Sequence, residues 1–344
     1  MARVTLADVA RAAGVSAATA SHVLRPRDRP AGTIRVSDAT QQAVCRTAEE
    51  LGYVASAAAR DLASGSASRI AIMVPNLHQP YFARMAETLI LALEQRGSST
   101  TLRLSYDAQA ERDAVLGRTT RDVAGVILCP HALSAELLAG ATPPLPVVQV
   151  GGGPTPGIDC VVMGEYEGAL AAARHLLDIG RRRIAYIADP ALPSRDGPRY
   201  RAYVDAHTER GLDVDARLAV EGADWDRRET GLEAMVGLLR SGTPFDAVMC
   251  VNDAVAVGAM RAVSLAGLRI PEDVAFSGFD NTEEAAFTTP PLTSVDPGVP
   301  EMAQLAVAML TARLAGDQGP ARRETALTEL VVRASSGAAR PDGA

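Results

Sequence analysis

The amino-terminal part of the chain takes its structure from Val4–Leu24, VTLADVARAAGVSAATASHVL. Its apolar residues recur at three- and four-residue spacing, which predicts a helix with a buried face made of Leu6, Val9, Ala10 and Ala13. Gly14 is expected to end this helix, because glycine adopts the left-handed backbone of a helix stop at little steric cost. Ser16 is the expected N-cap of a second helix, since its hydroxyl accepts an otherwise unpaired backbone N–H.

The second helix is expected to present two different faces. Its inward face would consist of Ala20, Val23 and Leu24, and its outward face of Ala17, Ala18, Ser21 and His22. Two short helices joined by a glycine turn form the layout that places the second helix in the DNA major groove. The residues alone leave an alternative open, in which the pair packs a domain as an αα-hairpin and binds nothing.

A third helix is expected beyond an arginine-rich loop. Residues 25–35, RPRDRPAGTIR, contain two prolines and a glycine and predict an exposed loop. Ser37 is expected to cap the helix that Gly52 ends, with an inward face of Ala43, Val44, Thr47, Ala48 and Leu51. Residues 53–68 predict either a linker that becomes helical only when it is held or a plain tether.

From Arg69 onward, apolar strands alternate with helices. This alternation predicts parallel sheets covered on both faces. Two such runs, the second beginning at Tyr166, predict an α/β fold of two Rossmann-like lobes with a ligand cleft at the strand carboxyl ends. One helix is expected from Ala110 to about Arg121. Residues 321–337 are expected to give one last strand, and residues 337–344 a disordered tail.

Composition limits the function classes. The 344 residues suggest two or three domains, and the four cysteines are far apart with no CxxC, so neither a metal site nor a disulfide framework is expected. No secretory or membrane-spanning segment is visible, which predicts a cytoplasmic protein with no membrane partner. Residues 1–69 carry nine arginines and six acidic residues, a net charge of +3, whereas the remainder carries −10. A basic head on an acidic body indicates that the head meets a polyanion.

Motifs from head and body occur together in one chain: VTLADVARAAGVSAATASHVL, EELGY, AAARDLASG, QPYF, VNDAVAVGAMRA, IPEDVAFSGFDN and PPLTSVD. In this order they resemble the lactose/galactose-repressor (LacI/GalR) family of bacterial transcription regulators. The resemblance implies a helix-turn-helix head (1–55), a hinge helix and linker (56–68) and a body of the periplasmic-binding-protein type (69–336). Its N-lobe is expected at about 69–165 and 296–322, and its C-lobe at about 166–295 and 323–336.

The resemblance also implies which residues meet double-stranded operator DNA. Phosphate-facing positions match Thr5, Ser16, Thr19 and Ser21, and base-reading positions match Ala17, Ala18 and His22; Leu6 and Arg25 complete the set on the head. Alanine contacts a thymine methyl but forms no bidentate bond, so base reading here rests on His22 and on DNA shape. Arg25, Arg27 and Arg29 are expected to add phosphate contacts. In the hinge, Ser56 and Ala59 line the minor groove, while Leu62 either wedges into it or anchors the linker on the body.

A regulator of this family is implied to be a homodimer and a repressor whose DNA affinity responds to a sugar or nucleoside effector in the cleft. The effector positions that match are Tyr81, Phe82, Arg195, Trp225, Asn252 and Asp280, with Arg199 as the alternative to Arg195. Asn252 precedes a predicted helix and is equally expected to be its N-cap. Gly151 and Gly164 stand where relatives often carry acidic residues.

The sequence disfavours two functions other than that of a DNA-binding regulator. A transport-type solute-binding protein is disfavoured by the basic head and the absence of a signal peptide. An enzyme is disfavoured because GxGxxG after a strand, GxSxG and a histidine cluster are absent, and all 34 basic residues are arginine, so there is no P-loop lysine. The sequence therefore predicts a non-enzymatic protein without a cofactor.

Overall fold

The structure, a computed structural model, describes residues 4–24, 36–51, 69–105, 107–120, 122–130, 142–188, 197–222 and 227–337. The chain divides into two compact units, residues 1–68 and residues 69–344. Within the described ranges no helix is long and apolar enough to cross a membrane.

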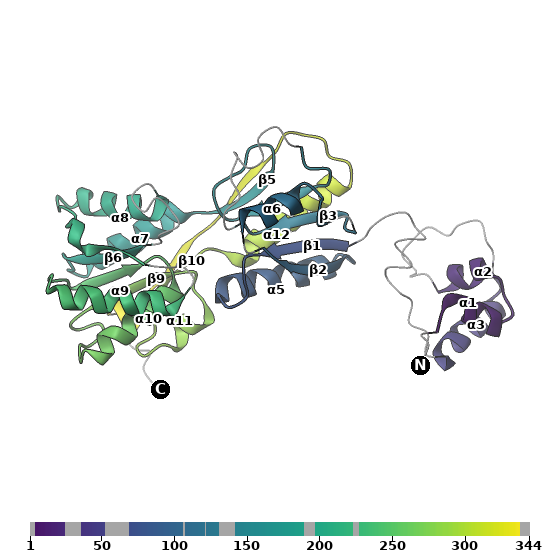
Figure 1. The fold of residues 1–344 in the computed structure, drawn as a ribbon, viewed down its shortest axis with the longest axis horizontal. Helices are drawn as coiled ribbons and strands as arrows, with labels where there is room; N and C mark the ends of the chain where they lie inside the picture. The colour runs from purple at the N-terminus through teal and green to yellow at the C-terminus, as the bar shows by residue number, and fades with distance from the viewer. Residues whose placement is uncertain are drawn as a thin grey trace. The chain divides into compact units, whose positions relative to one another are not determined.

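The first unit contains three short helices: α1 (Leu6–Ala12), α2 (Ala17–Val23) and α3 (Asp38–Glu50) (Figure 1). Their N-caps are the hydroxyl residues Thr5, Ser16 and Ser37, and each accepts a backbone N–H from the first turn. The buried core consists of Val9, Ala10, Ala20, Val44 and Ala48. The prediction for Leu51 is wrong: it follows α3 as the C-cap and is 39% exposed.

The first sheet of the body has the strand order β11-β5-β4-β3-β1-β2. Its strands are β1 (Arg69–Val74), β2 (Ser99–Leu104), β3 (Gly125–Leu128), β4 (Val147–Val150), β5 (Asp159–Met163) and β11 (Arg323–Ala326), and all neighbouring pairs are parallel. Helices α5 (Pro80–Glu94) and α12 (Val299–Leu314) share one buried cluster with this sheet, and α6 (Ala108–Val115) packs in another.

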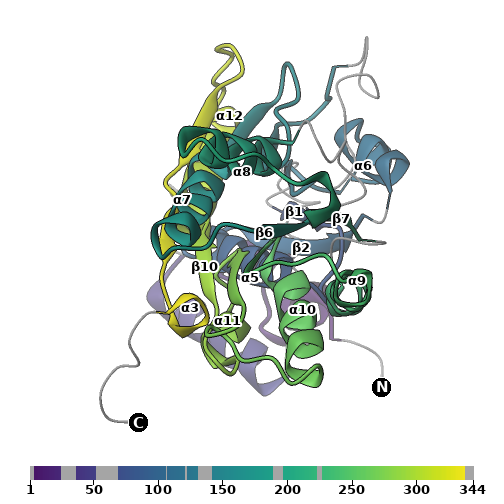
Figure 2. The ribbon, with the colours of Figure 1, turned by 90° about the vertical axis from the view of Figure 1, so that its left-hand side faces the viewer.

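The second sheet has the order β12-β10-β9-β8-β6-β7, with only the β12–β10 pair antiparallel. Its strands are β6 (Ile184–Ala188), β7 (Ala219–Glu221), β8 (Ala247–Cys250), β9 (Ala275–Phe279), β10 (Thr293–Asp296) and β12 (Glu329–Val331). Helices α7 (Glu165–Asp178) and α8 (Pro198–Glu209) cover one face, whereas α9 (Arg228–Ser241) and α10 (Asp253–Leu265) cover the other (Figure 2). Three short helical segments complete this lobe: η1 (Ala216–Leu218), α11 (Glu283–Phe287) and η2 (Ala334–Ser336).

Each sheet forms its own lobe of the body, and the chain passes between the lobes after β5, after β10 and after β11 (Figure 1). The expected single last strand over 321–337 is wrong. The chain forms two strands there, because Leu327 and Thr328 carry it from the first sheet to the second. The expected lobe boundary near residue 322 is therefore also too early, since β11 pairs with β5 of the N-lobe.

The helix expected to reach about Arg121 ends earlier, at Val115. Gly117 adopts a φ of +70°, and the N–H of Arg118 donates to the carbonyl of Asp113 at 2.8 Å. This glycine-dependent stop satisfies the last helical carbonyls and turns the chain toward β3.

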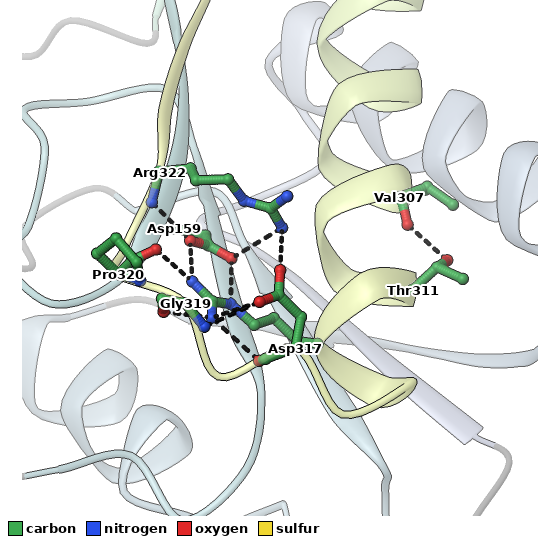
Figure 3. A network of polar contacts seen from close by, with 8 residues as sticks. Asp159, Val307, Thr311, Asp317, Gly319, Pro320 and Arg322 are labelled. Carbon is green, nitrogen blue, oxygen red and sulfur yellow. Dashed lines mark hydrogen bonds and ion pairs between the residues drawn. The ribbon is translucent and has the colours of Figure 1, made fainter.

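A network of charged groups fixes the loop between α12 and β11 (Figure 3). The carboxylate of Asp159 is buried at the start of β5 and accepts two bonds of 2.8 Å from the Arg313 guanidinium. Arg313 also donates to the carbonyls of Asp317, Gly319 and Pro320, and the N–H of Arg322 donates to Asp159 at 2.7 Å. Burial works against ionisation, but these bonds hold the pKa of Asp159 below its ordinary value. The network thereby holds β11 against β5.

Helices α9 and α10 approach each other so closely that only glycine fits at two positions. A Cβ on Gly231 would lie 1.9 Å from the carbonyl oxygen of Val255, and one on Gly258 would lie 1.8 Å from that of Arg228. Both neighbouring atoms belong to the backbone, so relief requires moving a whole helix.

We expect Gly258→Ala to lower the free energy of unfolding by about 1–3 kcal/mol, because the added methyl overpacks the helix contact. Gly237→Ala is the matched control on α9, where a Cβ meets nothing within 4 Å. That substitution should raise stability by up to about 1 kcal/mol through helix propensity. Urea unfolding followed by circular dichroism checks both, and equal stability of Gly258→Ala and the unmodified chain would contradict the packing argument.

Candidate functional site

The start of α1 is held by a reciprocal capping box. The N–H of Thr5 donates to Asp8 Oδ2 at 3.0 Å, and the N–H of Asp8 donates to Thr5 Oγ1 at 3.3 Å. The hydroxyl of Thr5 also donates to Asp8 Oδ2 at 2.6 Å, and these bonds lower the pKa of Asp8. Thr5 therefore fixes the amino-terminal end of α1, whichever other partner it contacts.

Helix α2 presents a small, nearly uncharged surface. Ser16 caps it by accepting the N–H of Thr19 at 3.0 Å, and the two hydroxyl oxygens lie 2.8 Å apart. Ala17 and Ala18 are exposed, whereas Leu6, Thr19, Ser21 and His22 are half-buried. The first turn of α2 thus offers N–H groups, two hydroxyls and two methyl groups to a partner, a combination suited to phosphate oxygens and thymine methyls.

Several predicted residues lie outside the described part of the chain. They are Arg25, Arg27 and Arg29 in the loop, Ser56, Ala59 and Leu62 in the hinge, and Arg195 and Trp225 among the effector positions; the predicted disordered tail is also outside it, apart from Gly337.

In the body, the start of α5 brings two aromatic rings to the carboxyl end of β1. Tyr81 and Phe82 are each 7% exposed, with ring centroids 5.1 Å apart in an edge-to-face arrangement. Burial and the nearby carboxylates of Asp280 and Glu165 raise the pKa of Tyr81 well above its ordinary value. Tyr81 therefore remains a phenol that can donate a hydrogen bond.

Asp280 reaches the same place from the carboxyl end of β9. It is 5% exposed, its backbone N–H donates to the carbonyl of Val295 at 2.8 Å, and its Oδ2 accepts from Gln79 Nε2 at 3.1 Å. Burial raises the pKa of Asp280 to about 6, although Arg199 and Gln79 oppose the shift. Near neutral pH this carboxylate is an acceptor for ligand hydroxyl or N–H groups.

Arg199 of α8 adds a guanidinium to the cluster. Its Nε donates to Glu165 Oε1 at 3.0 Å, its Nη2 forms an ion pair with the same oxygen at 2.8 Å, and its Nη1 donates to the carbonyl of Val251. Its Cζ lies 3.8 Å from the centroid of the Phe279 ring. The cluster therefore contains a cation already paired with a carboxylate and stacked on an aromatic face.

The two residues at the start of α10 have different roles. Asn252 caps the helix, with Oδ1 accepting the N–H of Val255 at 2.9 Å, so the cap expected as one alternative is present. Asp253 is fully buried and accepts from Thr282 N at 2.8 Å, Thr282 Oγ1 at 3.1 Å and Ser294 Oγ at 2.6 Å. Burial and the charge of Asp280 raise the pKa of Asp253 to about 8.

The structure brings Tyr81, Phe82, Arg199 and Asp280 together and adds residues that the sequence reasoning missed, namely Gln79, Glu165 and Asp253. Gln79 is the first residue of the QPYF motif and Asp253 directly follows Asn252, but nothing in the sequence shows that these polar groups are buried. Within the described ranges, histidine, cysteine and carboxylate side chains form no group of three that could hold a metal ion.

Comparisons with known proteins agree with both units. Residues 5–56 match the family described as bacterial regulatory proteins, lacI family, and residues 173–336 match the periplasmic binding protein-like domain. The chain is 31% identical to the HTH-type transcriptional repressor PurR of Mannheimia succiniciproducens, over 96% of this chain and 98% of that protein. The structure of the Lac repressor dimer bound to operator and the anti-inducer ONPF is similar, with a TM-score of 0.83 and 25% identity over 98% of this chain and all of that one. The CelR–cellobiose complex has a TM-score of 0.66 and 28% identity over 97% of this chain and all of that one.

A helix-turn-helix head joined to a two-lobed α/β body with a polar cluster at its strand ends defines a DNA-binding transcriptional regulator with an effector-binding domain. Similarity over nearly the whole length of a repressor at 31% identity then fixes the family. The chain belongs to the LacI family of bacterial regulatory proteins.

The buried carboxyl of Asp253 predicts a specific pH dependence of stability. Its pKa in the folded chain, about 8, exceeds the ordinary value of 3.8, so the folded state binds the extra proton. Its contribution to stability is therefore complete below about pH 4 and is lost as the pH rises through about 8. Asp253→Asn removes this dependence. The free energy of unfolding of the variant, relative to that of the unmodified chain, should therefore rise by more than about 1 kcal/mol between pH 5 and pH 8.5.

Urea unfolding of both proteins across this pH range provides the measurement. Asp213→Asn, at an exposed carboxylate, is the matched control and should show a constant difference from the unmodified chain. A difference that does not change with pH for Asp253→Asn would show that the carboxyl is ionised throughout.

Proposed function

We propose that this regulator is a cytoplasmic repressor that binds a palindromic operator as a homodimer and that a sugar or nucleoside in the interlobe cleft controls its DNA affinity. The observation that carries the proposal is that one chain combines a capped helix-turn-helix with Tyr81, Arg199 and Asp280 converging at the strand ends of the body. No catalytic role is proposed for these residues.

The DNA contacts are proposed on the exposed start of α2. Ser16, Thr19 and Ser21 would meet phosphates, Ala17 and Ala18 would meet thymine methyls, and His22 would supply the polar base contact. Thr5, Leu6 and Arg25 complete the proposed contacts of the head, and Ser56, Ala59 and Leu62 those of the hinge. With few base-edge hydrogen bonds available, discrimination between sites would depend strongly on DNA shape.

Dimerisation is supported by apolar side chains that the N-lobe leaves in water. Leu77 and Leu91 are 45% and 53% exposed, and Leu102 and Leu104 of the edge strand β2 are each 38% exposed. Exposed apolar groups of this kind are typical of surfaces that another chain covers. A dimer also brings two heads to one operator, which a palindrome requires.

The chemistry of the cluster supports the proposed effector class. Tyr81 and Phe82 offer aromatic surface, the Tyr81 phenol can donate, and the Asp280 carboxylate can accept from hydroxyl groups. Trp225, Asn252 and either Arg195 or Arg199 are proposed to complete the site. One relative of known structure, CelR, was solved with cellobiose, which supports a polyhydroxylated ligand.

Selection of bound sequences from a random duplex pool tests the operator proposal. We expect an inverted repeat whose half-sites are related by a two-fold axis. His22→Ala should flatten the preference at one base pair per half-site, worth about 1–3 kcal/mol, because it removes the polar base contact. Gln41→Ala, on the exposed side of α3, is the control. Recovery of no enriched sequence would refute the proposed function.

Thermal unfolding in the presence of sugars and nucleosides tests the effector proposal. A true ligand at 100 times its Kd stabilises the chain by about 2.7 kcal/mol, so Tm should rise by roughly 5 °C or more. Asp280→Asn should abolish most of this rise, because an amide replaces the acceptor carboxylate. Asp213→Asn should retain it. A rise that persists in Asp280→Asn would place the ligand elsewhere.

A further inference from the structure

Gln79 connects the two lobes through both ends of one side-chain amide. Its Oε1 accepts the backbone N–H of Tyr81 at 2.6 Å within the N-lobe, and its Nε2 donates to Asp280 Oδ2 at 3.1 Å in the C-lobe. The side chain is buried, with Gln79 only 1% exposed, and the residue's own N–H donates to Asn76 Oδ1 at 3.0 Å. Because the amide is rigid and planar, it can make both bonds only when the lobes hold one particular arrangement.

The C-lobe partner of Gln79 lies in a strained corner. Asp280 and Asn281 have φ angles of +103° and +44°, a left-handed backbone that strains residues other than glycine. The corner persists because Asn281 is bonded on several sides: its N–H donates to Ser294 Oγ, its Nδ2 to Asp296 Oδ2, and its Oδ1 accepts from Arg333. Strain that surrounding bonds maintain is typical of sites that aim a functional group.

A second hydrogen bond across the lobes supports the same arrangement. Arg84 of α5 donates from Nη1 to the carbonyl of Asn281 at 3.2 Å, and its Nη2 lies 4.0 Å from Asp296 Oδ2. Arg84 lies in α5 of the N-lobe and Gln79 lies just before it. Both residues contact the same corner of the C-lobe. A change in the lobe arrangement therefore alters the surroundings of Asp280 directly.

We infer that Gln79 is a positioning residue for the effector site, which holds the Asp280 carboxylate in its binding orientation only while the lobes keep this arrangement. The inference rests on the proposed function, in which Asp280 accepts from the effector. Gln79 donates to Oδ2 of Asp280, so the effector is expected to donate to Oδ1 of Asp280. When the lobes separate, Asp280 loses its donor, and effector affinity and lobe arrangement change together.

The charged and titratable groups around Asp280 come from four helices. They are Tyr81 and Arg84 of α5, Glu165 of α7, Arg199 of α8 and Asp253 of α10. Arg199, Gln79 and Arg84 favour the ionised carboxylate, whereas burial and Glu165 oppose it. Removing the amide of Gln79 therefore shifts the protonation of Asp280 in a predictable direction, without the need for any ligand.

Two substitutions of Gln79 separate its role toward Asp280 from its role in capping α5. Gln79→Glu keeps an oxygen for the N–H of Tyr81 but loses the donor to Asp280. Gln79→Met removes both groups and introduces no charge, and it serves as the second variant where Gln79→Glu does not fold. Gln95→Glu, at the exposed end of α5, is the matched control.

The first measurement is hydrogen–deuterium exchange of the full ligand-free chain. In Gln79→Glu we expect exchange in peptides covering 278–284 to rise by about tenfold, while the start of α5 changes by less than about twofold. The second measurement is the stability difference between the chain and its Asp280→Asn variant as a function of pH. This difference changes between about pH 4 and pH 6 and levels off near pH 6, and that upper limit should move upward by about one pH unit in the Gln79→Met background.

Unchanged exchange at 278–284, together with a stability difference that still levels off near pH 6, would overturn the assignment and leave Gln79 as a helix cap only. Neither measurement uses DNA or a small molecule. A chain that binds no operator or effector but shows both changes would therefore refute the proposed function, while the Gln79–Asp280 link would stand.

Discussion

The constraint on which the body depends is the burial of two carboxyl groups, those of Asp253 and Asp280, close to each other at the strand ends of one sheet. A buried carboxylate is tolerated only where nearby groups replace its hydration. Asp253 obtains all of its described donors from its own lobe, through Thr282 and Ser294. Asp280 obtains one from the opposite lobe, through Gln79. Satisfying Asp280 therefore fixes how the lobes meet.

Local features of the fold serve this junction. A Cβ at position 278 would lie 2.3 Å from Asp253 Oδ1, so glycine is required where β9 passes this carboxylate. The close contact of α9 with α10 sets the start of α10, where Asn252 and Asp253 lie. The bonds of Asp296 to Gly298 N and to Asn281 tie a crossover segment to the same corner. Movement of one lobe against the other would thus change the hydrogen bonding of Asp280. An effector-controlled switch needs a group that responds to movement in this way.

Much of this architecture could be predicted from the sequence, because periodicity and capping are local. The helices capped by Ser16 and Ser37 and the alternation of strands and helices follow from short-range patterns. The last strand could not be predicted correctly, because whether residues 323–331 form one strand or two depends on which sheet edge each half meets. Gly117 is a local signal for the early end of α6 at Val115, but the helical pattern around it obscures this signal.

The candidate site was predictable only in part. Tyr81, Phe82 and Asp280 lie within recognisable motifs, and the sequence offers Arg199 as the alternative to Arg195. Gln79 and Glu165 could not be found in this way, because their roles depend on partners 201 and 34 residues away. The surroundings that raise the pKa of Asp253 likewise combine segments that are distant in the chain and meet only after folding.

The central claim is that occupancy of the Asp280 site changes the affinity of the head for DNA. The most direct measurement is a fluorescence anisotropy titration of the selected operator duplex with the full chain, with and without a saturating sugar or nucleoside that raises its Tm. The account predicts a change of about 5- to 150-fold in operator affinity, abolished by Asp280→Asn. An operator affinity that is identical with and without the bound ligand would contradict it.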